Sequence, residues 1–568
     1  MTGDTTRSST DPANVRWVLL AIVGLGLALR LAHFRAISGT AYPDLPLIAT
    51  ELDMYATLEW AQAILAGDWL GRDTYHPYFQ WMRGLASPET WYRWWGGKEI
   101  FQQAPLYPYS VALLWQLSAR SLEGVILIQL VLGSLQPLVL YALAKQLFDA
   151  RAGLVAAALA ACYGPFIFYQ GTLLRDWIPP LLEPLVLLLV LRARATGRAA
   201  TWFSAGIVFG LALLTKETVL LFLPLVLLWI LLTNRRSLPQ ACRAGGLLLL
   251  GLLLILSPLV WRNAMVGAPL LSISNRAPEG FIEGVAPDNY PIGLQYPPSM
   301  AGILERANGD FLRVIQETLA LYRGDWQSVI NKMVIKLRGV VDPIEVPNNL
   351  DFSYAVELSP VLRLTLGYGL IFPIGLTGVL ASLRLWREHL PILLYGMAAL
   401  AGLMSTVIVA RYRLVLAPLL LVYGAAAIVC LWDLARERRL GRLAGGLALV
   451  SAVAVAQHLG APIPVVHAHP VVTIYGAEYT LSSRLYAFGV GSIGPWLKSC
   501  GCGPGRPWLL NFQKRQTSSL KPSYGRANTG FNGPTSFSIG GRKKRRTCKY
   551  VWRRRPTRST SATAVRST

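Results

Sequence analysis

The stretch RAGGLLLLGLLLILSPLVW, residues 243–261, carries no charged side chain after its first residue and decides the fold class. A helix of about 20 such residues crosses the roughly 30 Å hydrocarbon core of a bilayer. Similar apolar runs recur from Val15 to about Gln457. Membrane strands would alternate apolar and polar residues and close into a barrel, and these runs do not alternate. The sequence therefore predicts an all-α polytopic membrane protein.

The overall composition agrees with this prediction. The chain has 568 residues, of which 53% are hydrophobic and 15% charged. The net charge of +24 is typical of nucleic-acid binding proteins, but its location removes that interpretation. Eighteen Lys and Arg residues and no Asp or Glu follow residue 483, which leaves +6 for the preceding chain. We therefore expect no nucleic-acid partner, and the six cysteines have neither zinc-site spacing nor a disulfide pattern.

We predict a bundle of about eleven transmembrane helices from the apolar runs. The runs are 15–34, 124–147, 152–172, 177–195, 199–215, 218–233, 243–261, 362–383, 390–410, 412–432 and 441–457. A shorter run, 106–117, is ambiguous. If it lies at the interface, the basic loops after residues 191, 233, 383 and 435 share a face with the N-terminus, which the positive-inside rule makes cytoplasmic. We therefore expect an interfacial or re-entrant helix at 106–117.

The same alternation of loops between the two faces of the membrane divides the chain into five parts. Residues 1–14 form a cytoplasmic tail, and 15–261 a membrane module whose first loop, 35–123, lies outside the cytoplasm. Residues 262–361 form a small extracytoplasmic cap, 362–457 the C-terminal membrane helices, and 458–568 a tail. From about residue 488 that tail is basic and lacks helical periodicity, so we expect disorder. A polybasic arm for anionic lipids, an unselected linker and a shifted reading frame remain open, and the composition favours the last.

Acidic residues beside the first span mark a candidate site. The segment PDLPLIATELDMYATLEWAQAILAGDWLG, residues 43–71, contains Glu51 and Asp53. A second acid, Asp176, opens a later span, where it would also suit a helix N-terminus. Acids this close to a bilayer are costly without a partner or a task. Solvated or helix-capping acids remain the alternative interpretation.

Basic residues on the same predicted face complete the candidate site. They are Arg175, Lys216, Arg262, Arg411 and Arg413. Arginine at an outer boundary runs against the positive-inside trend. A lipid-linked phosphate would explain it, because the guanidinium fork pairs with phosphate oxygens. Snorkelling to phospholipid headgroups is the competing interpretation.

The order of several motifs resembles the GT-C glycosyltransferases, specifically bacterial relatives of the dolichyl-phosphate-mannose protein mannosyltransferases. The resemblance runs over about residues 15–430. Its motifs are the LDxxxY segment at Asp53, AILAGDWLG, QAPLYPY, LIQLVLGSLQPLVLYALAKQLF, GTLLRD, GLALLTKET, SPLVWRNAMVGAPLLSISN and RYRLVLAPLLL. Each motif alone is weak, and only their order is specific.

The resemblance implies inverting transfer of a sugar from a polyprenyl-phosphate donor to an extracytoplasmic lipid, glycan or protein. It also implies a bacterial inner membrane, with Asp53 as the catalytic base and Asp176 as a second catalytic acid. The basic residues would bind the donor phosphate, and Glu51, Gln103 and Tyr107 are further candidates. Aminoarabinose transferases carry Glu-Lys where this chain has Gln102-Gln103. A divalent metal thus remains only a possible cofactor, and we identify no metal ligands.

Two rival functions stay open at this level. A transporter or flippase of lipid-linked sugars predicts acids along a path through the span interior, whereas a transferase predicts acids gathered on one outer face. A non-catalytic subunit of a membrane assembly is the second rival.

Overall fold

The computed structural model describes residues 12–40, 42–50, 52–72, 82, 85–459 and 463, together with four short strands. Contacts divide the chain into two units, residues 1–492 and 493–568, which we describe separately. Within residues 12–459 every regular element is a helix. The prediction of an all-helical membrane protein is therefore confirmed for this part of the chain.

The first part of the chain forms one long helix and several short ones. They are α1 (Pro12–Ile37), η1 (Tyr42–Asp44), α2 (Leu45–Ile48), α3 (Asp53–Leu65), α5 (Pro88–Trp95) and α6 (Leu106–Leu117). At 1.5 Å per residue α6 is only about 18 Å long, which is too short to cross a bilayer without an extension. Its interfacial placement stays a prediction.

Proline interrupts several of the predicted spans in the central part of the chain. The helices are α7 (Leu122–Gly133), α8 (Gln136–Leu147), α9 (Ala150–Ala161), α10 (Gly164–Gln170), η2 (Arg175–Trp177), α11 (Pro179–Thr196), α12 (Ala199–Leu213), η3 (Glu217–Leu221), α13 (Phe222–Thr233) and α14 (Leu238–Val266). Pro137, Pro165 and Pro179 each lie at the start of a new helix. Proline suits this position because its missing N–H would be unpaired there in any case.

The segment after α14 carries short helices before the chain returns to long apolar ones. The short helices are α15 (Ala277–Val285), α16 (Met300–Ala307), α17 (Phe311–Ala320), α18 (Trp326–Val341), α19 (Phe352–Leu358) and α20 (Pro360–Arg363). The last group comprises α21 (Tyr368–Ser382), η4 (Leu383–Leu385), α22 (Trp386–Ser405), α23 (Ala410–Arg413), α24 (Ala417–Arg436) and α25 (Leu440–His458).

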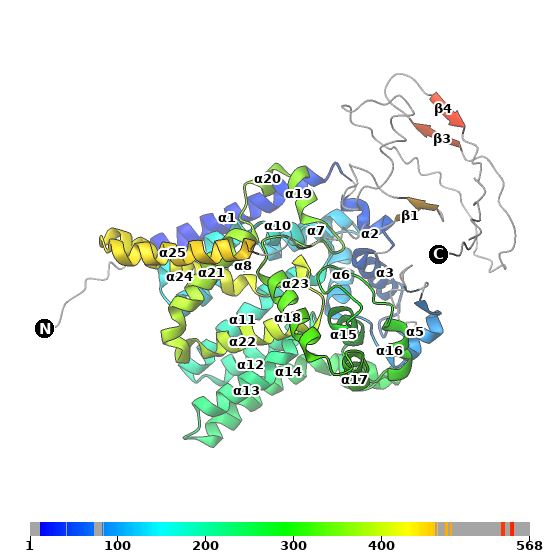
Figure 1. The fold of residues 1–568 in the computed structure, drawn as a ribbon, viewed down its shortest axis with the longest axis horizontal. Coiled ribbons are helices and arrows are strands. Elements are labelled where there is room, and N and C mark those ends of the chain that lie inside the picture. The colour runs from blue at the N-terminus through cyan, green and yellow to red at the C-terminus, as the bar shows by residue number, and fades with distance from the viewer. Residues whose placement is uncertain are drawn as a thin grey trace, which may run out of the picture. The chain divides into compact units, whose positions relative to one another are not determined.

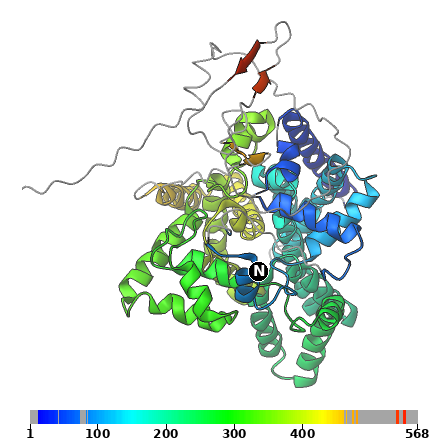
Figure 2. The same ribbon diagram turned by 90° about the vertical axis from the view of Figure 1, so that its right-hand side faces the viewer.

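Figure 1 shows α21, α22, α24 and α25 running roughly parallel, with α15, α16 and α17 gathered beyond one end of them. Figure 2 shows the molecule from that end. The tightest helix pairs are α12 with α14 and α21 with α24. Close approach in the first pair requires a missing side chain, because a Cβ added at Gly251 would lie 2.2 Å from the carbonyl oxygen of Phe203.

By length and composition, six stretches of the described residues qualify as membrane spans: 14–37, 122–147, 238–266, 368–405, 417–436 and 440–458. The helices at 150–161, 199–213 and 217–233 are apolar but shorter. The total of eleven spans therefore stays a prediction. The boundaries expected at 390–410 and 412–432 shift, because the chain leaves α22 at Ser405 and forms the separate short helix α23 before α24.

The predicted tail contains two short antiparallel strand pairs. In the first unit β1 (Val472–Ile474) pairs with β2 (Ala477–Tyr479), and in the second β3 (Ser536–Ile539) pairs with β4 (Arg546–Lys549). The β3–β4 pair lies in the region for which the sequence predicts disorder. The other residues after 463 lie outside the described part of the chain, as does the N-terminal tail before residue 12.

Candidate active site

Asp53 lies at the first position of α3, where Asn349 binds both its backbone N–H and its carboxylate. Its backbone N–H donates to Asn349 Oδ1 at 2.7 Å, and Asn349 Nδ2 donates to Asp53 Oδ2 at 3.0 Å. Asn349 has a positive φ of 62°, a conformation that asparagine tolerates better than most residues. The loop before α19 thus holds Asp53 through a residue that sequence reasoning did not select.

Arg411 joins the two predicted catalytic acids. Its Nη2 lies 2.7 Å from Asp53 Oδ2, and its Nη1 lies 3.2 Å from Asp176 Oδ2. The Arg411 and Asp176 side chains are both buried. Three segments separated by more than a hundred residues therefore meet at one point. The sequence placed these segments on one face, and the structure brings Asp53, Asp176 and Arg411 into direct contact.

The charges around Asp53 determine its protonation. Burial acts to raise the pKa of Asp53, but Arg411, with Arg276 and Arg175 at longer range, outweighs burial and lowers it. Burial likewise acts to lower the pKa of Arg411, and the two carboxylates raise it instead. Both groups are therefore ionised at neutral pH, so Asp53 can accept a proton.

Lys216, in the turn between α12 and η3, extends this chain of charges. Its Nζ lies 3.5 Å from Asp176 Oδ1 and 4.5 Å from the centroid of the Tyr412 ring. Arg411 Cζ lies 5.2 Å from the same centroid. Burial lowers the pKa of Lys216, although Asp176 opposes the shift. Asp176 and Tyr412 therefore hold two cations close together.

A cavity of about 200 Å³ opens beside these cations. Its charged lining comprises Arg175, Lys216, Arg276, Glu217 and Glu283. Neither Asp53 nor Asp176 lines it. Asp176 is connected to it through Lys216, and Asp53 is connected more remotely, through Arg411 and Asp176. Two guanidinium nitrogens of this region, Arg175 Nη1 and Arg411 Nε, are buried without a hydrogen-bond partner among the described residues. Unpaired buried donors of this kind are costly unless a ligand satisfies them.

Sequence reasoning missed the far wall of this cavity. Arg276 precedes α15 and pairs with Glu279 and, at 3.2 Å, with Glu283. Burial, with help from Glu279 and Asp53 and against Arg276, raises the pKa of Glu283 to about 7. Residues 276, 279 and 283 are three and four apart, so they lie on one helical face. That spacing is the signal that would have revealed them.

A second cavity, of about 290 Å³, adjoins Asp53 through its neighbour Met54. In the described part of the chain its charged lining residues are Asp44 and Glu123, with no lysine or arginine among them. The two cavities therefore differ in charge, since cations dominate the first and acids the second.

Arg262 and Arg413 do not join the acidic pair. Arg262 donates to the carbonyl oxygens of Leu70, Glu99 and Gly71 at 2.6–2.9 Å and stacks 3.8 Å from the Phe101 ring centroid. These bonds tie the first loop to the end of α14. A role in holding this loop therefore explains Arg262 better than the predicted contact with donor phosphate.

The two Nη atoms of Arg413 are likewise bound within the protein. Arg413 donates to the carbonyl oxygens of Gly339, Asp342 and Ile344 and lies 3.2 Å from Glu345. These contacts fix the chain after α18 against α23. For Arg413 too, the hydrogen bonds favour a structural role over the predicted phosphate contact.

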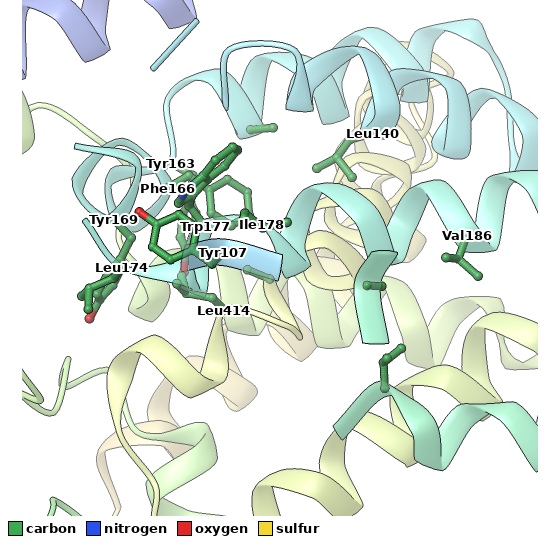
Figure 3. Packing of buried hydrophobic residues seen from close by; sticks show 14 of the residues in the cluster. Tyr107, Leu140, Tyr163, Phe166, Tyr169, Leu174, Trp177, Ile178, Val186 and Leu414 are labelled. Atoms are coloured by element: carbon green, nitrogen blue, oxygen red, sulfur yellow. The ribbon is translucent and has the colours of Figure 1, made fainter. Parts of the chain in front are cut away.

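The remaining candidates occupy different surroundings. Gln103 Nε2 lies 3.5 Å from Asp53 Oδ1, so it reaches the acidic pair at long range. Tyr107 donates to Gln129 Oε1 at 2.9 Å inside the helix bundle. Figure 3 shows Tyr107 among the apolar side chains that surround Trp177 and Ile178, directly after Asp176. Glu51 lies outside the described residues.

Metal ligation was left open by the sequence. Among the residues described between 12 and 463, no three His, Cys, Asp or Glu side chains form a group that could hold a metal ion.

Comparison with known proteins gives one match in sequence and several in structure. Residues 102–261 match the family model of the dolichyl-phosphate-mannose-protein mannosyltransferases. This range contains Gln103, Tyr107, Arg175, Asp176 and Lys216, but neither Asp53 nor Arg411. A comparison with curated protein sequences finds no match.

Three solved structures illustrate a distant similarity in fold. The apo oligosaccharyltransferase of Archaeoglobus fulgidus has a TM-score of 0.44 and 18% identity, over 80% of this chain and 57% of that chain. The complex of the same enzyme, AglB, with an inhibitory peptide and dolichol-phosphate has a TM-score of 0.43 and 18% identity, over 79% of this chain and 56% of that chain. ArnT from Cupriavidus metallidurans, bound to undecaprenyl phosphate, has a TM-score of 0.33 and 14% identity, over 74% of this chain and 80% of that chain. The chain thus spans little more than half the length of the oligosaccharyltransferase.

The family-model match covers the segment that supplies Asp176 and Lys216, two of the four groups in the chain of ion pairs. Over residues 102–261 the chain is therefore similar in sequence to the dolichyl-phosphate-mannose-protein mannosyltransferases, and within this range the family resemblance predicted from the sequence is confirmed.

Proposed function

We propose that the protein is a membrane glycosyltransferase that moves a sugar from a polyprenyl-phosphate donor to an acceptor hydroxyl outside the cytoplasm. The observation that carries this proposal is the continuous chain of ion pairs from Asp53 through Arg411 and Asp176 to Lys216, beside a cavity lined by cations. The family whose model matches residues 102–261 is named for a polyprenyl-phosphate sugar, which supports this kind of donor.

The donor phosphate belongs in the first cavity. Three cations and two acids line it, whereas the charged residues that line the second cavity in the described part of the chain are two acids, which would repel a phosphate. Arg175, in the wall of the first cavity, keeps a buried N–H without a partner that can donate to a phosphate oxygen. The second cavity, next to Met54, is then left for the acceptor, so that Asp53 lies between donor and acceptor.

The proposed chemistry is an inverting displacement. The acceptor hydroxyl oxygen bonds to the anomeric carbon as the bond from that carbon to the phosphate oxygen breaks, and the bonding electrons leave with the phosphate. Asp53 takes the hydroxyl proton. Its Oδ2 is bound by Arg411 and Asn349, whereas Oδ1 has only Gln103 at 3.5 Å and is the freer oxygen. Phosphate is a good leaving group, so no general acid is required, unlike in glycoside hydrolysis.

Asp176 takes the role of arranging the cations. Its two oxygens pair with Lys216 and Arg411 and hold both toward the departing phosphate. Preorganised charge of this kind stabilises the negative charge that develops in the transition state. We place the reaction at the outer face of a bacterial inner membrane, with the N-terminus in the cytoplasm.

Transfer assays test the proposal directly. The purified protein in nanodiscs is given radiolabelled polyprenyl-phosphate sugars and a membrane extract, and the labelled acceptor is measured. Removing a general base lowers the rate by about 10²–10⁴-fold, which is the loss expected for Asp53→Asn. The exposed ion pair of Arg306 offers a control variant, Arg306→Gln, which should transfer normally.

A variant that spares the ion pairs separates donor binding from stability. Arg175 forms no ion pair within the described part of the chain, so Arg175→Gln should fold normally while raising the KM for the donor. Unchanged transfer in Asp53→Asn would contradict the catalytic assignment. Absence of transfer from every donor, together with movement of lipid-linked sugar across vesicle membranes, would favour the transporter instead.

A further inference from the structure

One helix outside the predicted spans has its apolar face turned outward. Along α18, Trp326, Ile330, Val334 and Leu337 are each 47–63% exposed. Their spacing of four, four and three residues forms a single stripe. On the opposite side, Lys332 and Lys336 are buried. A helix covering a protein core in water would show the reverse arrangement.

The buried lysines do not neutralise any carboxylate at hydrogen-bond distance. Lys332 Nζ donates to the carbonyl oxygens of Ala286 and Asn289, and Lys336 Nζ donates to those of Gly284 and Met404. These bonds fasten α18 to the end of α15, whose residues Gly280 and Glu283 line the first cavity. They account for the inward face of α18 but leave the outward stripe unexplained.

The position of α18 relative to the spans identifies what covers the stripe. Tyr368, the first residue of α21, donates to the carbonyl oxygen of Val340 at 2.8 Å. Gln457, at the end of α25, donates to that of Val341 at 2.8 Å, and Lys336 reaches Met404 at the end of α22. Because Lys336 and Val340 are one helical turn apart on α18, the start of α21 and the end of α22 lie close together, at one boundary of the bundle. The helix is therefore anchored where the spanning helices leave the bilayer.

The exposed face of α18 is suited to lipid in its chemistry as well. No acidic residue lies between 326 and 341, and the exposed amides Gln327 and Asn331 hydrogen-bond to each other at 3.0 Å. Arg323 lies just before the helix and Arg338 in its last turn, where basic groups can meet phosphate headgroups. Of the two acids at its ends, Asp325 caps the first turn and Asp342 is buried. A helix with an apolar stripe and basic residues near both ends suits the plane of a membrane interface.

We infer that α18 is a membrane-surface helix whose stripe of Trp326, Ile330, Val334 and Leu337 inserts among outer-leaflet lipids at the boundary between headgroups and acyl chains. The contact between α18 and lipid also fixes the position of α15, which is bound to α18 through Lys332 and Lys336. One wall of the first cavity therefore lies at the level of the lipid headgroups. The inference rests on the placement of α18 and does not depend on the proposed transferase activity.

Environment-sensitive labels test the inference. Single cysteines replace Ile330 or Val334 in a variant whose native cysteines are changed to serine, and each is labelled with the fluorophore NBD in proteoliposomes. An exposed polar side chain of α17, replaced in Arg313→Cys, is the control. All three side chains are on the surface, so the substitutions leave the fold intact.

Lipids carrying a nitroxide at a shallow acyl position should quench the labels at 330 and 334 by about twofold and leave the label at 313 unchanged. A water-soluble nitroxide should do the opposite. Quenching of 330 and 334 by the aqueous reagent would show a hydrated stripe and overturn the inference. Protection from both reagents would show that protein covers the stripe, and would overturn it as well.

Discussion

Replacing Arg411 should expose how strongly the candidate site depends on one buried cation. The change Arg411→Gln removes contacts of 2.7 and 3.2 Å and leaves Asp53 and the buried Asp176 without their shared partner. Removing one member of a buried ion pair costs about 3–5 kcal/mol, because the remaining charge stays desolvated. We expect a loss of this size, even though Lys216 still lies 3.5 Å from Asp176.

The loss can be measured as a shift in the midpoint of thermal unfolding in nanodiscs. The unfolding entropy of a chain of several hundred residues is about 1 kcal/mol/K, so we expect the midpoint to fall by about 3–5 °C. The matched control is Arg93→Gln, which breaks the 2.7 Å pair with Glu305 in which both side chains are more than half exposed. An exposed pair contributes about 0–1 kcal/mol, and the control should shift by about 1 °C or less.

The pH dependence of the loss identifies its cause. Burial acts to raise the pKa of Asp53, and without Arg411 its effect is no longer outweighed, so this carboxylate can reduce its desolvation cost by taking up a proton. The deficit of Arg411→Gln should therefore shrink between about pH 7.5 and about pH 5.5. The double variant Asp53→Asn/Arg411→Gln should recover part of it at pH 7.5. Equal midpoints for Arg411→Gln and Arg93→Gln, or a deficit independent of pH, would refute the reasoning.

Three further variants test packing and protonation through thermal midpoints. Gly251→Ala should lower the midpoint because its Cβ would meet the Phe203 carbonyl, whereas Gly246→Ala on the same helix has no atom within 4 Å and should not; equal midpoints would contradict this packing. Burial lowers the pKa of Lys336 from 10.5 to about 7. Between these two pH values the folded wild type binds fewer protons than the unfolded chain, so its stability increases as the pH rises. The midpoint of Lys336→Met relative to wild type should therefore be higher at pH 6 than at pH 9. Burial raises the pKa of Glu283 from 4.5 to about 7, so the wild type loses stability as the pH rises between these two values. Glu283→Gln should abolish this loss, and an unaltered pH profile of the midpoint would contradict the assigned role of Glu283.

The parts of the site that sequence reasoning predicted are those tied to the ends of spans. Asp53, Asp176, Lys216 and Arg411 each follow or precede an apolar run, so hydrophobicity and loop charge place them on one face. Their meeting at one point did not follow from either signal. It depends on how the helices pack, and in particular on the break between α22 and α24 that allows α23 to turn inward.

The parts that were missed lie in the segment between the two groups of spans. Arg276, Glu283 and Asn349 belong to short helices and loops, where no membrane constraint fixes which way a side chain faces. The partner of Asn349 is also distant in sequence, since 296 residues separate Asn349 from Asp53. The apolar stripe of α18 has helical spacing in the sequence, but spacing alone does not distinguish a core face from a face turned to lipid.

The arginines of the outer boundary show why residue type alone does not assign a role. Arg262 and Arg413 direct their guanidinium groups mainly to backbone carbonyls, which are neutral and fixed, so they hold loops in place. Arg411 is balanced by two carboxylates and still keeps its Nε without a partner, while Arg175 lines the cavity with a free Nη1. A phosphate needs donors that the fold has not already used. Arg413 also keeps an Nε without a partner, but of these four arginines Arg175 alone lines the first cavity with an unused donor. An unused donor at the cavity wall, rather than the positive charge common to all four residues, therefore marks Arg175 as the arginine to bind the phosphate.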